Sequence, residues 1–248
     1  ARGRALGGRG AFAFSPHRSH FTARPDRLHP VPDDIKPETA ALIPVAETAT
    51  NLVLDGRPLV GERVAVLGAG MIGLMTTRVL STVPLERLTV VEPVAQRREL
   101  AEAMGADETI LPENVGALGT RGDPPGMDLV YELSGSPTAL NDAIDAVGYD
   151  GRIVVGSWYG RTSVEVDLGG FFHRNNVDIS ASQVSRISPE HRGRWTKARR
   201  MDVAWDHLRT VDVDRLVTHR VPFEEAHQAF RLLDDGPDDV LQVLLTYG

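Results

Sequence analysis

Short apolar runs alternate with helical patterns through the middle of this chain. Six runs rich in Val, Ile and Leu are bounded by turn-forming residues, which predicts buried β-strands at 63–67, 88–92, 108–111, 128–133, 151–156 and 177–181. Between them, apolar residues recur with helical spacing at 71–80, 94–104 and 138–147, and Gly105 and Gly148 follow the last two segments. Strands that alternate with helical crossovers predict an α/β fold, a doubly wound parallel sheet.

The two ends of the chain differ from this middle part. Residues before about 45 are rich in Pro, Arg and His, with strand-like pieces such as 11–14 and no complete helix. Residues from 184 onward hold a basic stretch and then further short elements. We expect a helix at 201–208, a strand at 216–221, an amphipathic helix at 223–233 and a strand at 240–246. The pattern therefore divides the chain into segments 1–44, 45–183 and 184–248.

A glycine pattern joins the first predicted strand to the first predicted helix of the middle segment. Gly68 permits a tight turn, Gly70 removes a Cβ that would collide with phosphates, and Gly73 lets the helix pack closely on the strand. The free N–H groups of the helix start, which include Met71 and Ile72, face an anion. The spacing predicts that a nucleotide pyrophosphate binds at this loop.

The second apolar run ends in an acid, Glu92, nineteen residues after Gly73. That spacing suits a carboxylate that accepts hydrogen bonds from the adenosine ribose of a dinucleotide. Because a carboxylate would repel a 2′-phosphate, the sequence favours NAD over NADP. Arg97 leaves the choice open, since an arginine just past the acid can bind a phosphate as easily as a ribose.

Small polar residues follow the later strands. Ser134 and Gly135 come after the fourth run, Ser157 after the fifth and Ser182 after the sixth. In an open α/β sheet the cofactor binds outside the carboxyl ends of the strands, near the point where strand order reverses. We expect these residues to contact the cofactor, although Gly and Ser are also common in ordinary turns.

Composition and charge exclude several classes of protein. A net charge of −7 argues against general nucleic-acid binding. No apolar run approaches the roughly 20 residues that span a bilayer, so we expect a cytoplasmic protein without a membrane partner. An apolar fraction of 42% can bury a sizeable core. The absence of cysteine excludes disulfides, a thiol nucleophile and Cys-ligated zinc.

Several of these features together resemble the medium-chain dehydrogenase/reductase superfamily, the alcohol dehydrogenase-like group. The resemblance runs from about Ala11 to the end, and it is carried by 42–51, the 68–73 loop, Glu92, 105–107, 151–156 and 216–230. Its most specific part is Thr-His-Arg-Val-Pro-Phe at 218–223, which follows the nucleotide-binding segment in the right order. The resemblance implies a dinucleotide-binding Rossmann domain at 45–183. It also implies the end of a β-rich catalytic domain at 1–44 and the C-terminal part of that domain at 184–248.

Two stretches, 44–51 and 194–200, look most like the branch that contains bacteriochlorophyllide dehydrogenase and related zinc-free members. Most of the superfamily's N-terminal catalytic domain has no counterpart here, so we expect the chain to start near the end of that domain. Zinc-dependent members place a metal ligand near Ile43, and no cysteine stands there. His17 and His20 have no third ligand nearby and are interpreted as a solvated loop. The resemblance thus implies no metal site and a zinc-independent reaction.

Three residues are candidates for the chemistry. The resemblance places Glu47 and Thr48 close to the nicotinamide, where a buried carboxyl group could act as a general acid or base with a raised pKa. Glu47 is also interpretable as an N-cap or first-turn acid of the helix that runs toward Leu54. Tyr159 follows a strand end and could donate a proton to a carbonyl oxygen, although such a tyrosine is usually structural.

A basic stretch around Trp195 allows two interpretations. Its members are Arg186, Arg192, Arg194, Lys197, Arg199 and Arg200. They could form a mouth for an acidic substrate or for the cofactor phosphates, or they could be the solvated face of a helix start. The sequence leaves both open.

The leading hypothesis is an NAD(H)-dependent oxidoreductase that moves a hydride between the nicotinamide and a secondary alcohol or ketone without zinc. The alternative is a cofactor-binding or scaffold protein without turnover, because most of the catalytic domain is absent. A methyltransferase fits less well, since the strand order and the C-terminal pattern look more like those of dehydrogenases. The stretch 163–168 could extend a sheet across a homodimer.

Overall fold

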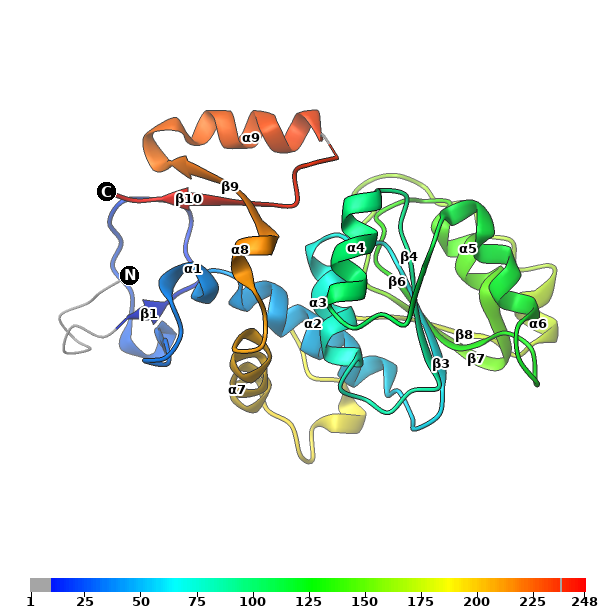
Figure 1. Ribbon diagram of the computed structural model, residues 1–248. Helices are drawn as coiled ribbons and strands as arrows, with labels where there is room; N and C mark the ends of the chain where they lie inside the picture. Colours follow the sequence, from blue (N-terminus) through cyan, green and yellow to red (C-terminus); the bar gives the residue numbers. More distant parts are fainter. Residues whose placement is uncertain (1–9, 237) are drawn as a thin grey trace. The chain divides into compact units, whose positions relative to one another are not determined.

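The computed structural model describes residues 10–236 and 238–248, so the first nine residues of the predicted segment 1–44 lie outside the described part. The chain divides into two compact units (Figure 1). We call Val45–Ala204 the sheet unit, and the residues up to Pro44 together with Trp205–Gly248 the terminal unit. Helices α2 (Ile43–Gly56) and α7 (Lys197–Leu208) each run from one unit into the other.

A six-stranded parallel sheet forms the centre of the sheet unit. Its strands lie in the order β5-β4-β3-β6-β7-β8. They are β3 (Arg63–Leu67), β4 (Arg87–Val91), β5 (Glu108–Ile110), β6 (Met127–Glu132), β7 (Val147–Val155) and β8 (Asp178–Ala181). All five neighbouring pairs are parallel. Strand order reverses between β3 and β6, which confirms the predicted doubly wound α/β fold.

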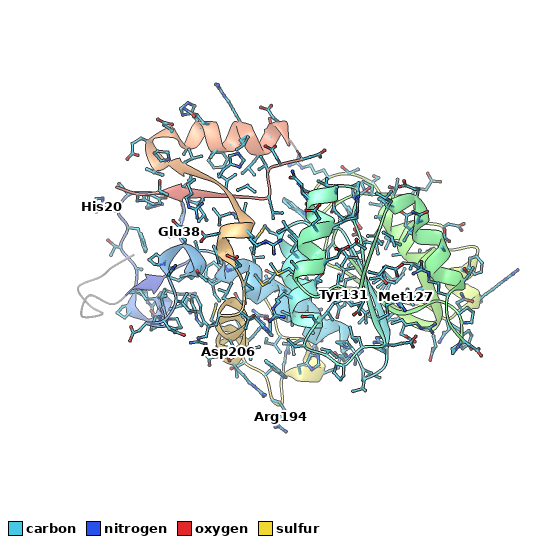
Figure 2. All side chains as sticks on the ribbon, in the orientation of Figure 1. His20, Glu38, Met127, Tyr131, Arg194 and Asp206 are labelled. Carbon is cyan, nitrogen blue, oxygen red and sulfur yellow. The ribbon has the colours of Figure 1, made fainter. Side chains whose placement is uncertain are left out.

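Helices cover both faces of this sheet (Figure 1). One face carries α2, α3 (Met71–Leu80) and α4 (Ala95–Ala103), and the other carries the 3₁₀ helix η3 (Pro112–Thr120), α5 (Ala139–Ala146) and α6 (Phe171–Arg174). Side chains that alternate along the strands pack on each layer, and β3 is buried along its whole length. Tyr131 and Met127, labelled in Figure 2, are both buried within β6.

The boundary between α5 and β7 differs from the expectation. The sequence predicts a helix at 138–147 ended by Gly148, but α5 ends at Ala146 and Gly148 lies inside β7. A Cβ at Gly148 would lie 2.6 Å from the carbonyl oxygen of Pro125. This glycine therefore permits a close approach of two backbones at the amino end of the sheet, where the register between β6 and β7 shifts.

The terminal unit contains short elements. They are β1 (Ala11–Phe12), η2 (Pro25–Arg27), β2 (His29–Pro30), α1 (Pro37–Ala40), α8 (Val213–Leu216), β9 (Val217–Pro222), η5 (Phe223–Glu225), α9 (Ala226–Asp235) and β10 (Gln242–Thr246). β1 pairs with β2 antiparallel, and β9 pairs with β10 parallel. A groove of about 1310 Å³ between these pieces is lined by apolar side chains such as Phe230, which is 60% exposed. Apolar surface of this kind is typical of a face that packs against other protein.

Residues 184–204 lie in the sheet unit, whereas the sequence analysis groups them with the C-terminal segment. They include η4 (Pro189–His191) and the first part of α7. The buried side chain of Arg200 anchors this stretch by an ion pair with Glu47 of α2. The predicted domain boundaries stay a prediction. In the described part of the chain, no helix is both long and apolar enough to cross a membrane.

Candidate functional site

The glycine loop lies at the point where strand order reverses. Gly68 follows β3 and has a positive φ of 98°, a conformation that favours glycine. A Cβ on Gly68 would lie 2.6 Å from Cα of Ser134, the second residue after β6. The N–H of Leu133 donates to the carbonyl of Leu67 at 2.9 Å, so the two loops stay side by side. The tertiary structure thus brings together two segments that the sequence analysis assigned to one site.

The other two glycines of the loop meet different surroundings. A Cβ on Gly73 would lie 1.9 Å from the carbonyl oxygen of Gly68, which accounts for the close packing of α3 on the loop. A Cβ on Gly70 would meet no protein atom within 4 Å. Gly70 is the N-cap of α3, and its carbonyl accepts the first N–H of the helix ladder, from Leu74. Open space at this helix start leaves the N–H groups of Met71 and Ile72 available to an anion.

Glu92 follows β4 and has a buried carboxylate beside the glycine loop. Its two oxygens accept N–H groups of Ala69, at 2.7 Å, and of Val94, at 3.0 Å. The bond from Ala69 fixes the glycine loop, a contact that the spacing between Gly73 and Glu92 does not predict. Each oxygen retains a lone pair for a hydroxyl group. Arg97 lies in the first turn of α4, the helix that follows Glu92, and is half-buried.

A second buried carboxylate, Glu132, ends β6. One oxygen accepts the N–H and the hydroxyl of Ser134 at 2.9 and 2.6 Å, and the other accepts the hydroxyl of Tyr159. Ser157 accepts the N–H of Gly135 at 2.8 Å. The structure therefore joins Ser134, Gly135, Ser157 and Tyr159 into one cluster, which we call the Glu132 cluster, at the carboxyl ends of β6 and β7.

The hydroxyl proton of Tyr159 is held by this cluster. Burial, followed by the hydrogen bond to Glu132, raises the pKa of Tyr159 above its ordinary value. The group is protonated at neutral pH and acts as a donor to Glu132. A role as proton donor to a substrate stays a prediction, and it requires that the proton leave this hydrogen bond.

Titration of tyrosine checks this arrangement. Because the folded state raises the pKa, Tyr159 should remain protonated when pH rises past the ordinary tyrosine value of about 10. We expect Tyr159→Phe to leave the phenolate absorbance of the folded protein at pH 11 unchanged. In denaturant, the same variant should lose one of four tyrosine titrations. The pH dependence of stability is a second readout. The free energy of unfolding of the wild-type protein should fall as the pH rises above about 10, and that of Tyr159→Phe should fall less steeply.

Glu47 is the fifth residue of α2, so it is neither the N-cap nor a first-turn acid, and that interpretation is wrong. The residue is 7% exposed, and its carboxylate accepts two bonds from Arg200, from Nη2 at 2.7 Å and from Nε at 3.3 Å. Thr48, next to it, is half-buried on the same helix. The ion pair compensates the negative charge of Glu47 inside the protein, as is usual for a buried carboxylate.

Ser182 belongs to the same polar network, which continues along α2. Asn51 donates to Asp55 at 2.9 Å and to Ser182 at 3.0 Å, and Ser182 donates to Asp55 at 2.7 Å. Neither Asn51 nor Asp55 was predicted as a site residue. Their signal was present in the four-residue spacing from Glu47, which places all three on one helix face.

The basic stretch 186–200 does not behave as a single surface. Arg200 is 1% exposed, so the interpretation as a solvated face is wrong for this residue. Arg194, labelled in Figure 2, is exposed, and Arg199 lies 4.2 Å over the ring of Trp195. Among the residues that the structure describes, no group of three or more His, Asp or Glu side chains is arranged to hold a metal ion.

Comparison with known proteins identifies the family of this chain. The family model described as zinc-binding dehydrogenase matches residues 71–201, more than half of the chain. L-threonine 3-dehydrogenase from Pyrococcus furiosus is 30% identical over 219 residues, which cover 83% of this chain and 57% of the relative. The chain therefore belongs to the zinc-binding dehydrogenase family, within the medium-chain, alcohol dehydrogenase-like superfamily. It spans less than two thirds of the length of this relative.

Solved structures share the fold. A short chain alcohol dehydrogenase from Escherichia coli CFT073, complexed with NADH, matches with a TM-score of 0.72 at 22% identity, covering 90% of this chain and 64% of that one. A protein from Sinorhizobium meliloti 1021 bound to NADP matches with a TM-score of 0.67 at 21% identity, covering 82% and 58%. At these identities the likeness establishes the fold alone.

Proposed function

We propose that this protein is an NAD(H)-dependent oxidoreductase that transfers a hydride between the nicotinamide and a secondary alcohol or ketone without zinc. The observation that carries the proposal is the start of α3, where the position of a Cβ on Gly70 is free of protein atoms while the neighbouring glycines are tightly packed. A loop that is rigid and yet open at its helix start fits a phosphate group. Membership of a dehydrogenase family supports the same cofactor class.

The chain's residues would hold the dinucleotide along the carboxyl edge of the sheet. The N–H groups of Met71 and Ile72 bind the pyrophosphate, and Glu92 accepts the ribose hydroxyls with the lone pairs that the backbone leaves free. Arg97 lies on the same side as Glu92. The Glu132 cluster and Ser182 lie at the ends of β6, β7 and β8, on the opposite side of the reversal point.

The choice of NAD over NADP rests on Glu92. A fixed negative charge close to the ribose opposes a 2′-phosphate, and the two backbone bonds prevent this carboxylate from swinging away. Proteins that share the fold bind NADH in one case and NADP in another, so the fold itself leaves the choice to local residues.

The nicotinamide would supply the hydride, and the chain would supply orientation and a proton. Of the three proposed catalytic residues, Glu47 is engaged by Arg200, and Thr48 lies beside it on α2. Tyr159 is protonated at neutral pH, as an ordinary tyrosine is, and its hydroxyl donates to Glu132 at the carboxyl ends of β6 and β7, the side proposed for the nicotinamide. We favour Tyr159 as the donor to the developing alkoxide because of this position; its raised pKa makes it a weaker acid, so its proton must leave Glu132 as the alkoxide forms.

The alternative is a cofactor-binding protein without turnover. The chain covers 57% of the length of its threonine dehydrogenase relative, so residues outside the match could be needed to close over a substrate. Both hypotheses require cofactor binding, and only the first requires consumption of NADH with a ketone. A panel of small secondary alcohols and ketones separates them.

Fluorescence titration with NADH and, separately, NADPH is the test. Trp158 directly follows Ser157, past the carboxyl end of β7, on the side proposed for the nicotinamide, so bound nicotinamide should quench its emission. We expect saturable quenching by NADH at lower concentrations than by NADPH, and we expect Trp158→Phe to lose most of this signal while nicotinamide emission still reports binding. Equal affinities for NADH and NADPH would contradict the proposal that Glu92 selects NAD over NADP. Binding of neither nucleotide would contradict both hypotheses, and unchanged turnover in Tyr159→Phe would remove Tyr159 as donor.

A further inference from the structure

Arg200 is surrounded by hydrogen-bond acceptors on every side. Its Nε and Nη2 donate to Glu47, Nη1 donates to the side-chain oxygen of Asn51, and the carbonyls of Arg186 and Val184 accept from Nη1 at 3.2 Å and from Nη2 at 2.7 Å. A guanidinium group has five N–H donors, and all five find an acceptor here. All of these residues lie within the sheet unit.

These contacts hold one short segment at three places, once directly by Asn51 of α2 and twice by Arg200 of α7, which is itself bonded to α2. The segment 182–186 follows β8, so it starts at the carboxyl edge of the sheet, the edge at which the glycine loop lies. Arg200 binds the backbone carbonyls of Val184 and Arg186, and Asn51 binds the hydroxyl of Ser182. The orientation of Asn51 is itself fixed, because its oxygen faces Arg200 while its nitrogen faces Ser182 and Asp55.

From this geometry we infer that Arg200 and Asn51 are positioning residues for the nicotinamide half of the cofactor. The inference rests on the proposed function. A doubly wound sheet binds the two halves of a dinucleotide on either side of the reversal point. Glu92, after β4, marks the adenosine side, so the nicotinamide half extends toward β6, β7 and β8. The segment 182–186 follows β8, the outermost strand on the nicotinamide side. Arg200 and Asn51 fix the position of its backbone by the hydrogen bonds described above.

A structural role alone would make a different prediction. If Arg200 only stabilised the fold, its replacement would weaken every part of the cofactor site to a similar extent. A positioning role weakens the contacts of the nicotinamide half and spares those of the adenosine half. The ratio between the affinities for NADH and for ADP-ribose, which lacks the nicotinamide, therefore separates the two roles.

The test compares Arg200→Lys with a matched control, Arg63→Lys. Lysine keeps the charge next to Glu47 but has one nitrogen, so it cannot reach Asn51 and both carbonyls together. Arg63 is also buried, at 8% exposure, and donates to the carbonyls of Arg121 and Pro124 at 2.9 and 2.6 Å. It begins β3 and so lies at the opposite, amino edge of the sheet.

We expect Arg200→Lys to lower the affinity for NADH roughly tenfold, or about 1.4 kcal/mol, and to leave the affinity for ADP-ribose within about twofold. Arg63→Lys should leave the ratio of the two affinities at its wild-type value. Asn51→Ala is a second variant that keeps the Arg200–Glu47 ion pair, and it should shift the ratio in the same direction.

Three outcomes would overturn the inference. Equal losses for NADH and ADP-ribose in Arg200→Lys and Asn51→Ala would reduce Arg200 to a structural role, while the proposed function would stand. An unchanged NADH affinity in both variants would lead to the same conclusion. If the wild-type protein bound neither NADH nor ADP-ribose, the proposed function would fail and this inference would fail with it.

Discussion

Replacing Arg200 with methionine should destabilise the sheet unit by about 3–5 kcal/mol, the range typical for breaking a buried ion pair from one side. The carboxylate of the buried Glu47 would lose both of its bonds to Arg200, and the carbonyls of Val184 and Arg186 would each lose a donor. Urea unfolding followed by circular dichroism measures the change in the free energy of unfolding.

Two controls make this result specific. The double variant Arg200→Met with Glu47→Gln removes the unpaired charge and should recover a substantial part of the lost stability. Arg121→Met breaks an ion pair with Glu108 in which the arginine is 41% exposed, and it should cost only about 0–1 kcal/mol. If Arg200→Met were as mild as Arg121→Met, the buried network would contribute little to the fold.

The glycine loop should respond in opposite ways to two alanine substitutions. Gly73→Ala places a Cβ 1.9 Å from the carbonyl oxygen of Gly68, so it forces the loop and α3 apart and should destabilise the protein by about 1–3 kcal/mol or more. Gly70→Ala places its Cβ in open space with φ of −68°, which alanine adopts freely, so stability should stay unchanged. Thermal unfolding of the two variants measures this contrast.

Binding separates the same pair. A methyl group at Gly70 would occupy the space that a pyrophosphate needs, so Gly70→Ala should weaken NADH binding about 10- to 100-fold, the equivalent of about 1.4–2.8 kcal/mol, while the protein stays folded. Wild-type affinity in a folded Gly70→Ala protein would show that no ligand approaches the start of α3. That result would contradict the proposed cofactor site.

Glu92 and Glu132 occupy similar places in the sequence but make different contacts in the structure. Glu92 directly follows β4 and Glu132 is the last residue of β6, and each accepts a backbone N–H of the turn that comes next, from Val94 and from Ser134. Glu92 also accepts the N–H of Ala69 in the glycine loop. Glu92 fixes the glycine loop, and Glu132 fixes the turn at Ser134 and the hydroxyl of Tyr159. Only Glu92 was predicted as a site residue, because of its spacing from the glycine loop. An acid at the carboxyl end of an apolar run is the signal that the two share.

The sequence alone determined the order of strands and helices, the parallel sheet and the place of the glycine loop. These features depend on periodicity and on backbone conformation, which act over a few residues and can therefore be read along the chain. The tight turn at Gly68 and the apolar runs of β3 and β6 needed no distant partner to be predicted.

Only the tertiary structure decided the partners of the buried charges. Arg200 and Glu47 are 153 residues apart, and nothing in the spacing of the basic stretch distinguishes Arg200 from the exposed Arg194. The same holds for Ser182, which was predicted to contact the cofactor and which the fold places against Asn51 of α2. A buried charge is stable only where the fold brings an opposite charge and enough hydrogen bonds to it, and that condition depends on contacts distant in sequence.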